Sequence, residues 1–222
     1  MKVTAVVPAY NEAKTISQVV DGIKQVVDQV VVVDDGSKDD TGSLAKIAGA
    51  TVFTHFLNRG QGAALQTGLE AAVRDQADIV VTFDADGQHD PGDIKAVIEP
   101  IIRDQADIVL GSRFLSDNNQ IPISKTVILK IAAGITRFYT GLAVTDAHNG
   151  FRAFSKKAAQ LINIEQDGMA HASEIIEQIK KHQLIIKEIP VTIQYTEYSQ
   201  QKGQRITNSF KIIWDLILGR VK

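Results

Sequence analysis

Two carboxylates separated by one residue, Asp84 and Asp86, directly follow an apolar run that extends from residue 79 to residue 83. If that run is a β-strand, the alternation of side chains places both carboxylates on the same side of the chain where the strand ends. Neighbouring carboxylates repel each other unless a cation lies between them, and oxygen ligands suit Mg²⁺ or Mn²⁺. Gln88 offers a neutral oxygen two residues further on. A divalent metal site is therefore one interpretation of this stretch.

A plain turn is the other interpretation. Aspartate side chains often accept hydrogen bonds from turn and helix-start N–H groups, and here they would cap Gly87 and a helix that begins near Pro91. Asp-x-Asp is too short a pattern to separate the two interpretations. The residues that follow the other expected strands are needed to decide between the two interpretations.

The composition excludes several classes of protein. The chain has 222 residues, no cysteine and a formal net charge of -2. Its length suits one α/β domain with a substantial core, or two small domains. A broad basic surface is not expected, which argues against nucleic acid as a partner, and disulfides and thiolate metal sites are ruled out. The sequence contains neither a signal peptide nor a membrane-spanning apolar stretch, so we expect a cytoplasmic protein.

In the first half of the chain, apolar segments that are rich in β-branched residues alternate with amphipathic ones. Strands that are apolar on both faces and are separated by helices are typical of a parallel sheet with helices on both sides. We therefore expect an α/β fold. The expected strands are residues 3–7, 30–33, 51–53, 78–83 and 107–110, and the expected helices begin at 11 or 12 and cover 41–48, 63–73 and 91–102.

Polar residues follow four of these strands, at residues 10–12, 34–37, 84–86 and 112–113. The carboxyl ends of parallel strands lie at one edge of the sheet, which is where such folds bind ligands. This grouping weakens the plain-turn interpretation and favours a nucleotide site. The glycine-rich loops of P-loop and dinucleotide-binding proteins are missing from the expected places, so neither of those classes is predicted.

In the second half of the chain, the regular alternation of strands and helices is no longer expected. Helices are expected at 126–142 and 173–182, a loop at 146–152 leads into a short strand, and 185–193 is extended. We find no repeat and no linker, so residues 1–205 are predicted to form a single domain.

Residues 206–222 are predicted to form an amphipathic helix. An apolar stripe on one helix face either packs on the protein itself or lies in a membrane interface as an anchor, and both interpretations stay open. The stripe consists of Phe210, Ile213, Trp214, Ile217, Leu218 and Val221.

Five motifs follow one another along the chain: Pro8-Ala9-Tyr10-Asn11-Glu12, Val33-Asp34-Asp35-Gly36-Ser37, Asp84-Ala85-Asp86-Gly87-Gln88-His89, Gly111-Ser112-Arg113-Phe114 and Gly150-Phe151-Arg152. They occur in the order found in family 2 glycosyltransferases of the GT-A fold, and the chain most closely resembles the dolichol-phosphate mannose synthase-like branch. The resemblance implies a GT-A (Rossmann-like) three-layer α/β sandwich with a mostly parallel central sheet. It also implies an inverting, metal-dependent transfer of a mannose- or glucose-type sugar from a GDP- or UDP-sugar to a polyprenyl phosphate, either dolichyl or undecaprenyl phosphate.

The resemblance implies roles for individual residues as well. Asp35, or its neighbour Asp34, would accept a hydrogen bond from the nucleotide base. Arg113 and Arg152 would contact phosphates or the acceptor, and Lys125 would contact the acceptor phosphate. The implied nucleotide-sugar contacts are Pro8, Ala9, Tyr10, Glu12, Asp34, Asp35, Asp84, Ala85 and Asp86, and the implied Mg²⁺ or Mn²⁺ ligands are Asp84, Asp86 and Gln88.

The chemistry of the reaction agrees with these residue types. Negative charge builds on the leaving diphosphate, and a divalent metal neutralises it. A polyprenyl phosphate is already an anionic nucleophile, so the site needs cations to hold it and no strong base. A saccharide or protein hydroxyl as acceptor would instead need a carboxylate base. Asp146 is the first candidate for that base, and Glu174 is the second.

Two further hypotheses stay open. The chain could be a nucleotide-sugar-binding subunit of a membrane complex, without activity of its own. A lipid acceptor would require attachment at the cytoplasmic face of the membrane, through the membrane surface or a membrane-protein partner.

Among single residues, Asn58 is expected to cap a helix and His89 to order the metal loop, and Arg152 could alternatively form a structural ion pair with Asp146. Gly60 and Gly62 are expected to allow close packing where that helix starts.

Overall fold

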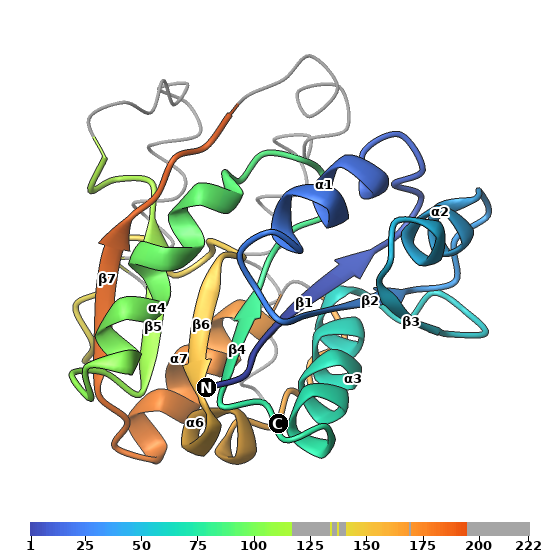
Figure 1. Cartoon of the computed structure of the whole chain (residues 1–222). Helices are drawn as coiled ribbons and strands as arrows, with labels where there is room; N and C mark the ends of the chain where they lie inside the picture. Colours follow the sequence, from blue (N-terminus) through green and yellow to red (C-terminus); the bar gives the residue numbers. More distant parts are fainter. Residues whose placement is uncertain (117–133, 135–136, 138–140, 169, 195–222) are drawn as a thin grey trace.

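The computed structural model describes residues 1–116, 134, 137, 141–168 and 170–194 (Figure 1). Within this part of the chain, seven strands form one sheet in the order β3-β2-β1-β4-β6-β5-β7. All neighbouring strands are parallel except β6, which is antiparallel to both β4 and β5. The strands are β1 Val3–Ala9, β2 Gln29–Asp34, β3 Thr51–Thr54, β4 Ile79–Thr82, β5 Ile108–Ser112, β6 Arg152–Ser155 and β7 Ile186–Pro190.

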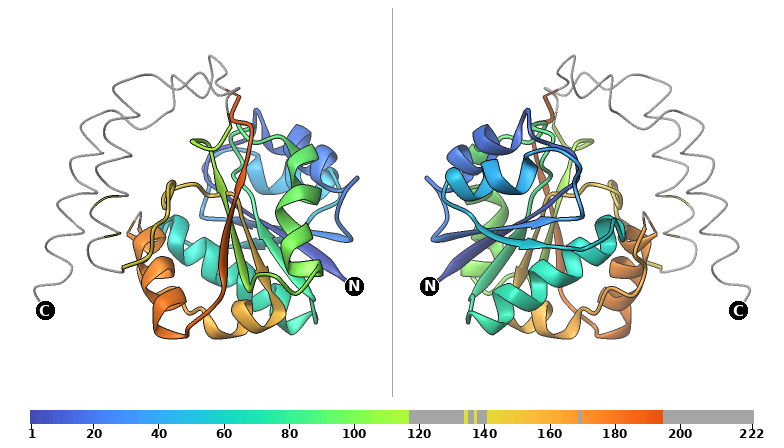
Figure 2. Two further views of the ribbon diagram at one scale, coloured as in Figure 1. Left: turned by 90° about the vertical axis from the view of Figure 1, so that its left-hand side faces the viewer. Right: turned by 90° about the vertical axis from the view of Figure 1, so that its right-hand side faces the viewer.

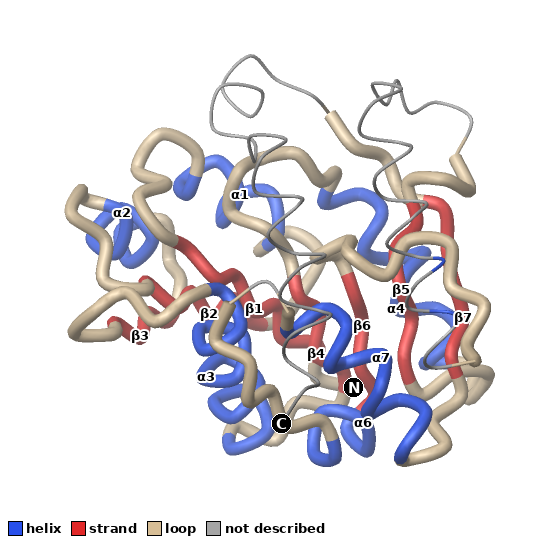
Figure 3. The backbone as a smooth tube through the Cα atoms, turned by 180° about the vertical axis from the view of Figure 1, so that it is seen from behind, coloured by secondary structure: helices blue, strands red, loops and turns tan. Residues whose placement is uncertain are grey.

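Helices cover both faces of the sheet, which gives the predicted three layers (Figure 2). Apolar residues of α1, α2 and α4 pack on one face, and those of α3, α6 and α7 pack on the face seen in Figure 3. The helices are α1 Ile16–Ile23, α2 Thr41–Ile47, α3 Gln61–Arg74, α4 Ile94–Ile102, α6 Lys156–Leu161 and α7 His171–Lys181, and a 3-10 turn, η1 Pro91–Asp93, precedes α4.

The strand β1 shows why the sequence folds this way. All of its residues are buried, and alternate ones belong to different cores. Ala5 and Val7 pack with α1 and α4, whereas Val6 packs with α3 and α7. A strand buried on both faces has no polar side, which is why the sequence pattern was a continuous apolar run rather than an alternation.

Several element boundaries differ from those expected. β1 continues through Pro8 to Ala9. A proline has no N–H to donate to a neighbouring strand, but the pairing of β1 with β4 stops at Val6, so Pro8 lies beyond the last pair on that side. α1 begins at Ile16 rather than at residue 11 or 12, after turns in which Glu12 O accepts hydrogen bonds. Neither α6 nor the antiparallel direction of β6 was predicted from the sequence.

Some predictions fall outside the described residues. These are Lys125, most of the helix expected at 126–142, and the amphipathic helix expected at 206–222. Among the helices that the structure does describe, none combines the length and the apolar character needed to span a membrane.

Candidate active site

The five sequence motifs meet at one edge of the sheet. β1, β2 and β4 are parallel neighbours, so the segments that follow them leave the sheet on the same side. β6 runs in the opposite direction, so its first residue, Arg152, also lies at this edge. Hydrogen bonds join motifs to each other: Asn11 N donates to Ser37 Oγ at 2.9 Å, and Gly111 N donates to Phe151 O at 2.9 Å. The structure thus brings together the polar residues that the sequence placed at separate strand ends.

The carboxylate of Asp84 lies just after β4 and accepts a side-chain hydrogen bond on each oxygen. Gln61 Nε2 donates to Oδ1 at 3.0 Å, and His89 Nε2 donates to Oδ2 at 3.1 Å. Burial opposes ionisation of Asp84, but the hydrogen bond and charge of His89, with the charges of Arg152 and His171, lower its pKa overall. Asp84 is therefore ionised at neutral pH and fixed in orientation.

Asp86 is the second carboxylate of the loop, and its Oδ1 accepts a hydrogen bond from Gln88 N at 3.0 Å. Burial, and after it the charge of Asp84, raise the pKa of Asp86 to about 6, with a smaller contribution from Glu12. A divalent cation would relieve this repulsion, and carboxylate and amide oxygens suit Mg²⁺ or Mn²⁺. The described residues contain no group of three His, Asp or Glu that could hold a metal unaided. Asp84, Asp86 and Gln88 fit a Mg²⁺-type site, in which substrate phosphates complete the coordination.

His89 packs against two phenylalanine rings that also contact each other. Its ring centroid lies 5.3 Å from that of Phe83 and 5.2 Å from that of Phe151, both in edge-on geometry. The side chain is buried and its Nε2 is directed at Asp84, in agreement with the expectation that His89 orders the metal loop. Gly150, which precedes Phe151, lies so close to Asp84 that a Cβ there would overlap the carboxylate. The orientation of Asp84 thus depends on packing as well as on hydrogen bonds.

The residues predicted to contact the nucleotide differ in exposure. Tyr10 is 38% exposed, whereas Ala9 and Glu12 are 3% and 9% exposed. Pro8 is buried inside β1, and Ala85 is buried in the metal loop. Of these residues, Tyr10 offers the largest accessible side chain, so we expect it to make the main contact with a bound nucleotide.

Both candidate base-binding aspartates make hydrogen bonds within the protein. Asp34 Oδ1 accepts from Ser37 N at 3.0 Å, and this bond closes the turn after β2. Asp35 Oδ1 accepts from Arg59 N at 2.9 Å, and its Oδ2 accepts from Gly60 N at 2.7 Å. Asp35 therefore has a role in holding the start of α3. Hydrogen bonding to the base by either aspartate stays a prediction.

Arg113 and Asp146, both predicted to be catalytic, form an ion pair. Arg113 Nε donates to Asp146 Oδ2 at 2.6 Å, and Arg113 N donates to the same oxygen at 3.1 Å. The two side chains are only 9% and 1% exposed. Glu188 of β7 accepts hydrogen bonds from Thr145 N and Asp146 N and so fixes the loop that carries the aspartate. The described ion-pair partner of Asp146 is thus Arg113, not Arg152 as the alternative hypothesis had it.

Arg152 is fully buried, and its guanidinium donates to Ala147 O at 3.1 Å. Burial lowers the pKa of Arg152 to about 10, although the charges of Asp84 and Asp146 oppose the shift. Burial also lowers the pKa values of His148 and His171 to about 4, and the charge of Arg152 contributes to both shifts. Arg152 is therefore a buried cation that lies in the electric field of the metal-loop carboxylate and of the Arg113 ion pair. A direct contact of Arg152 with a phosphate stays a prediction.

Other residues of the site escaped the sequence analysis or were assigned wrongly. Asn58 is not the helix cap, because Gly60 occupies that position and the first N–H groups of α3 donate to other acceptors. The close packing expected of Gly60 and Gly62 is confirmed, since a Cβ on either would overlap backbone oxygens of residues 166 and 167. Gln61 lies between these two glycines, a signal that could have placed it at the same sheet edge.

Comparison with known proteins identifies the family. The pattern of glycosyl transferase family 2 matches residues 4–162. The chain belongs to this family. It is 37% identical over 235 residues to the UDP-N-acetylglucosamine–dolichyl-phosphate N-acetylglucosaminyltransferase of Methanococcus voltae, covering 96% of this chain and 94% of that protein. It is 28% identical over 232 residues to the polyprenol monophosphomannose synthase of Mycolicibacterium smegmatis, covering 97% and 87%.

A solved structure agrees with the fold. Glucosyl-3-phosphoglycerate synthase of Mycobacterium tuberculosis, in complex with Mn²⁺ and UDP-glucose, superposes with a TM-score of 0.75 at 21% identity, covering 97% of this chain and 76% of that one. The predicted family 2 glycosyltransferase, its dolichol-phosphate mannose synthase-like branch and the GT-A fold are confirmed. The chain is therefore a glycosyltransferase.

Proposed function

We propose that this glycosyltransferase transfers a hexose or N-acetylhexosamine from a nucleoside diphosphate sugar to a polyprenyl phosphate, with inversion at the anomeric carbon and with Mg²⁺ or Mn²⁺ as cofactor. The names of two relatives, which cover almost the whole chain, support the acceptor class. The carboxylate pair at the end of β4 supports the metal, because buried neighbouring carboxylates are stabilised by a cation.

The acceptor assignment rests on the burial and the hydrogen bonds of the two candidate bases, Asp146 and Glu174. The side chain of Asp146 is only 1% exposed: its Oδ2 accepts two hydrogen bonds from Arg113, and its other oxygen, Oδ1, is buried away from solvent. Glu174 accepts hydrogen bonds from Glu165 N and Gln166 N, so its oxygens hold the segment before α7. A hydroxyl acceptor needs a base within hydrogen-bond reach, whereas a phosphate monoester attacks as an anion without one. The arrangement therefore favours the phosphate acceptor.

Each part of the proposed site has a separate task. The metal, when bound, would act as a Lewis acid on the donor diphosphate. Asp84, Asp86 and Gln88 would hold it, Tyr10 would lie against the nucleotide, and Asp146 would hold the Arg113 guanidinium in a fixed position beside the acceptor phosphate. Lys125 is a further candidate contact of the acceptor phosphate and lies outside the described residues.

A direct assay tests this proposal. The full chain is incubated with Mn²⁺, with UDP-N-acetylglucosamine, UDP-glucose or GDP-mannose, and with either undecaprenyl phosphate or a non-phosphorylated polyprenol. We expect glycolipid formation from one donor with the phosphate only, and none with excess EDTA. Transfer to saccharide or protein hydroxyls, or full activity in EDTA, would contradict the proposal. Donor binding without transfer to any acceptor would instead support the hypothesis of a non-enzymatic binding subunit.

Attachment to the membrane stays a prediction of the same proposal. A polyprenyl phosphate is anchored in a bilayer, so the enzyme has to reach the membrane surface, at the cytoplasmic face if the donor is made in the cytoplasm. Flotation of the full chain with anionic vesicles tests this, with a chain truncated after residue 205 as the comparison.

A further inference from the structure

Gln61, the first residue of α3, makes a contact that has no assigned role in the proposed reaction. Gln61 Nε2 donates a hydrogen bond to Asp84 Oδ1 at 3.0 Å. Its counterpart on the other oxygen is His89, whose ring is fixed by two phenylalanines. Two donors on opposite oxygens restrain rotation of a carboxylate. The position of Gln61 therefore bears directly on the direction in which Asp84 presents its remaining lone pairs.

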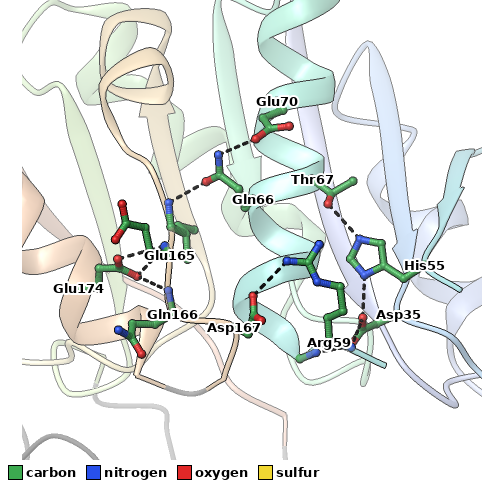
Figure 4. A network of polar contacts seen from close by, with 12 residues as sticks. Asp35, His55, Arg59, Gln66, Thr67, Glu70, Glu165, Gln166, Asp167 and Glu174 are labelled. Carbon is green, nitrogen blue, oxygen red and sulfur yellow. Dashed lines mark hydrogen bonds and ion pairs between the residues drawn. The ribbon is translucent and has the colours of Figure 1, made fainter. Parts of the chain in front are cut away.

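The start of α3 is fixed by acceptors on two sides. On one side, the carboxylate of Asp35 accepts hydrogen bonds from the backbone N–H groups of Arg59 and Gly60. On the other side, the backbone oxygen of Asp167 accepts from Gly62 N at 2.8 Å. Figure 4 shows Arg59 between Asp35 and Asp167, and its guanidinium is within 3.4 Å of the latter carboxylate. Gln61 thus stands between two restrained neighbours.

Close packing prevents the helix start from shifting. A Cβ at Gly60 or Gly62 would overlap backbone oxygens of the segment 163–168. That segment is itself held, because Glu174 accepts from two of its N–H groups and Gln66 Oε1 accepts from Ile164 N at 2.7 Å (Figure 4). The contacts on that side of α3 therefore form a continuous hydrogen-bonded support.

A histidine braces the opposite side of α3. His55 Nδ1 lies 2.7 Å from Asp35 Oδ1, and its Nε2 lies 2.9 Å from Thr67 Oγ1, two turns into the helix (Figure 4). The histidine thus links the aspartate to the body of α3 as well as to its start. These contacts fix the backbone from which the Gln61 side chain reaches Asp84.

We propose that Gln61 is a positioning residue for the metal, which acts by orienting the carboxylate of Asp84. This inference rests on the proposed function, since it takes the metal at Asp84 as given. A neutral amide suits the task, because it donates a hydrogen bond without cancelling the negative charge that attracts the cation. Partners behind a metal ligand typically contribute about 10–100-fold to metal affinity.

The test replaces Gln61 by methionine, which has a similar length and volume but cannot donate a hydrogen bond. Mn²⁺ binding to the full chain is measured by calorimetry, both without nucleotide and with UDP or GDP. We expect Gln61→Met to weaken Mn²⁺ binding about tenfold. The melting temperature of the metal-free protein should change by less than about 2 °C, because little buried apolar surface is altered. In the transfer assay, the Mn²⁺ concentration for half-maximal rate should rise, while the rate at saturating Mn²⁺ should stay within about twofold.

Gln25→Met is the matched control. Gln25 is exposed and its amide donates only to Asp21 O in the described structure, so Mn²⁺ binding should not change. Unchanged Mn²⁺ affinity in Gln61→Met, or a loss of affinity matched by a loss of metal-free stability, would overturn this inference and leave the proposed function standing. Absence of Mn²⁺ binding by the unsubstituted chain, with and without nucleotide, would overturn both.

Discussion

Two regions of the active site differ in how their polar groups are satisfied. The carboxylate side consists of Asp35, Gln61, Asp84, Asp86 and Gln88, and its carboxylates accept hydrogen bonds from named donors of neighbouring segments. The arginine side, between β5, β6 and α7, contains buried charged or polar groups that keep an atom without a partner among the described residues. These atoms are Asp146 Oδ1, His148 Nε2, Asn149 Nδ2, Arg152 Nε and Ser173 Oγ, whereas on the carboxylate side the described residues leave one such atom, Nδ1 of the His89 that holds Asp84.

The difference points to two kinds of preorganisation. On the carboxylate side, hydrogen bonds fix the orientation of groups that repel one another until a cation arrives. On the arginine side, the charged groups are buried and Arg113 is paired with Asp146. Removal of one partner therefore leaves an uncompensated charge in the interior. We therefore expect substitutions on the first side to affect metal binding and turnover with little loss of stability, and those on the second to reduce the stability of the fold as well as turnover.

The largest effect should come from the carboxylate side. Asp86→Ala removes a predicted metal ligand, and we expect the rate of sugar transfer to fall on the order of 10²–10³-fold. The metal-free protein should become slightly more stable, because a repelling buried carboxylate is lost. Asp21→Ala, on the exposed face of α1, is the control and should keep full activity. If Asp86→Ala kept its rate of glycolipid formation, the proposal that the carboxylate side serves metal binding and turnover would be wrong.

On the arginine side, Arg113→Met should destabilise the fold by about 3 kcal/mol, since Asp146 would stay buried without its cation. Urea denaturation measures this loss. Arg113→Met combined with Asp146→Asn should recover part of it, because the double variant leaves no unpaired charge. Arg103→Met removes an exposed ion pair with Glu99 and should cost less than about 0.5 kcal/mol. Equal stability of the Arg113 and Arg103 variants would contradict the proposed contrast.

Gly150 lies where the two sides meet. In Gly150→Ala, the new Cβ would overlap the carboxylate of Asp84, so either the loop or the aspartate has to move. We expect a loss of stability of about 1–2 kcal/mol together with weaker Mn²⁺ binding. In Gly134→Ala, none of the described residues lies within 4 Å of the added methyl group, so this control should do neither. A stable Gly150→Ala variant with normal Mn²⁺ affinity would show that the position of Asp84 does not depend on this packing.

The sequence predicted the sheet and its active edge because these depend on local patterns. Apolar runs gave the strands, and polar residues directly after them marked the edge. It could not predict that Asp146 pairs with Arg113, because 32 residues and a change of strand direction separate them. Gln61 was missed for a related reason: its partner Asp84 lies 23 positions away and is reached only after α3 packs on the sheet. Long-range pairs of this kind follow from packing rather than from pattern.

The smallest effect expected near neutral pH is a dependence of stability on pH that arises on the arginine side. Burial lowers the pKa values of His148 and His171 to about 4, below their ordinary value of 6.5. Between those pH values the unfolded chain binds more protons than the folded one, so stability is full above about pH 6.5 and falls as the pH drops toward 4. The two shifts together predict a loss on the order of 1 kcal/mol at pH 6.3, which grows to on the order of 5 kcal/mol at pH 4.5, measured by urea denaturation. His171→Gln should flatten this slope. An unchanged slope in that variant would mean that carboxylates, and not the buried histidines of the arginine side, set the acid sensitivity.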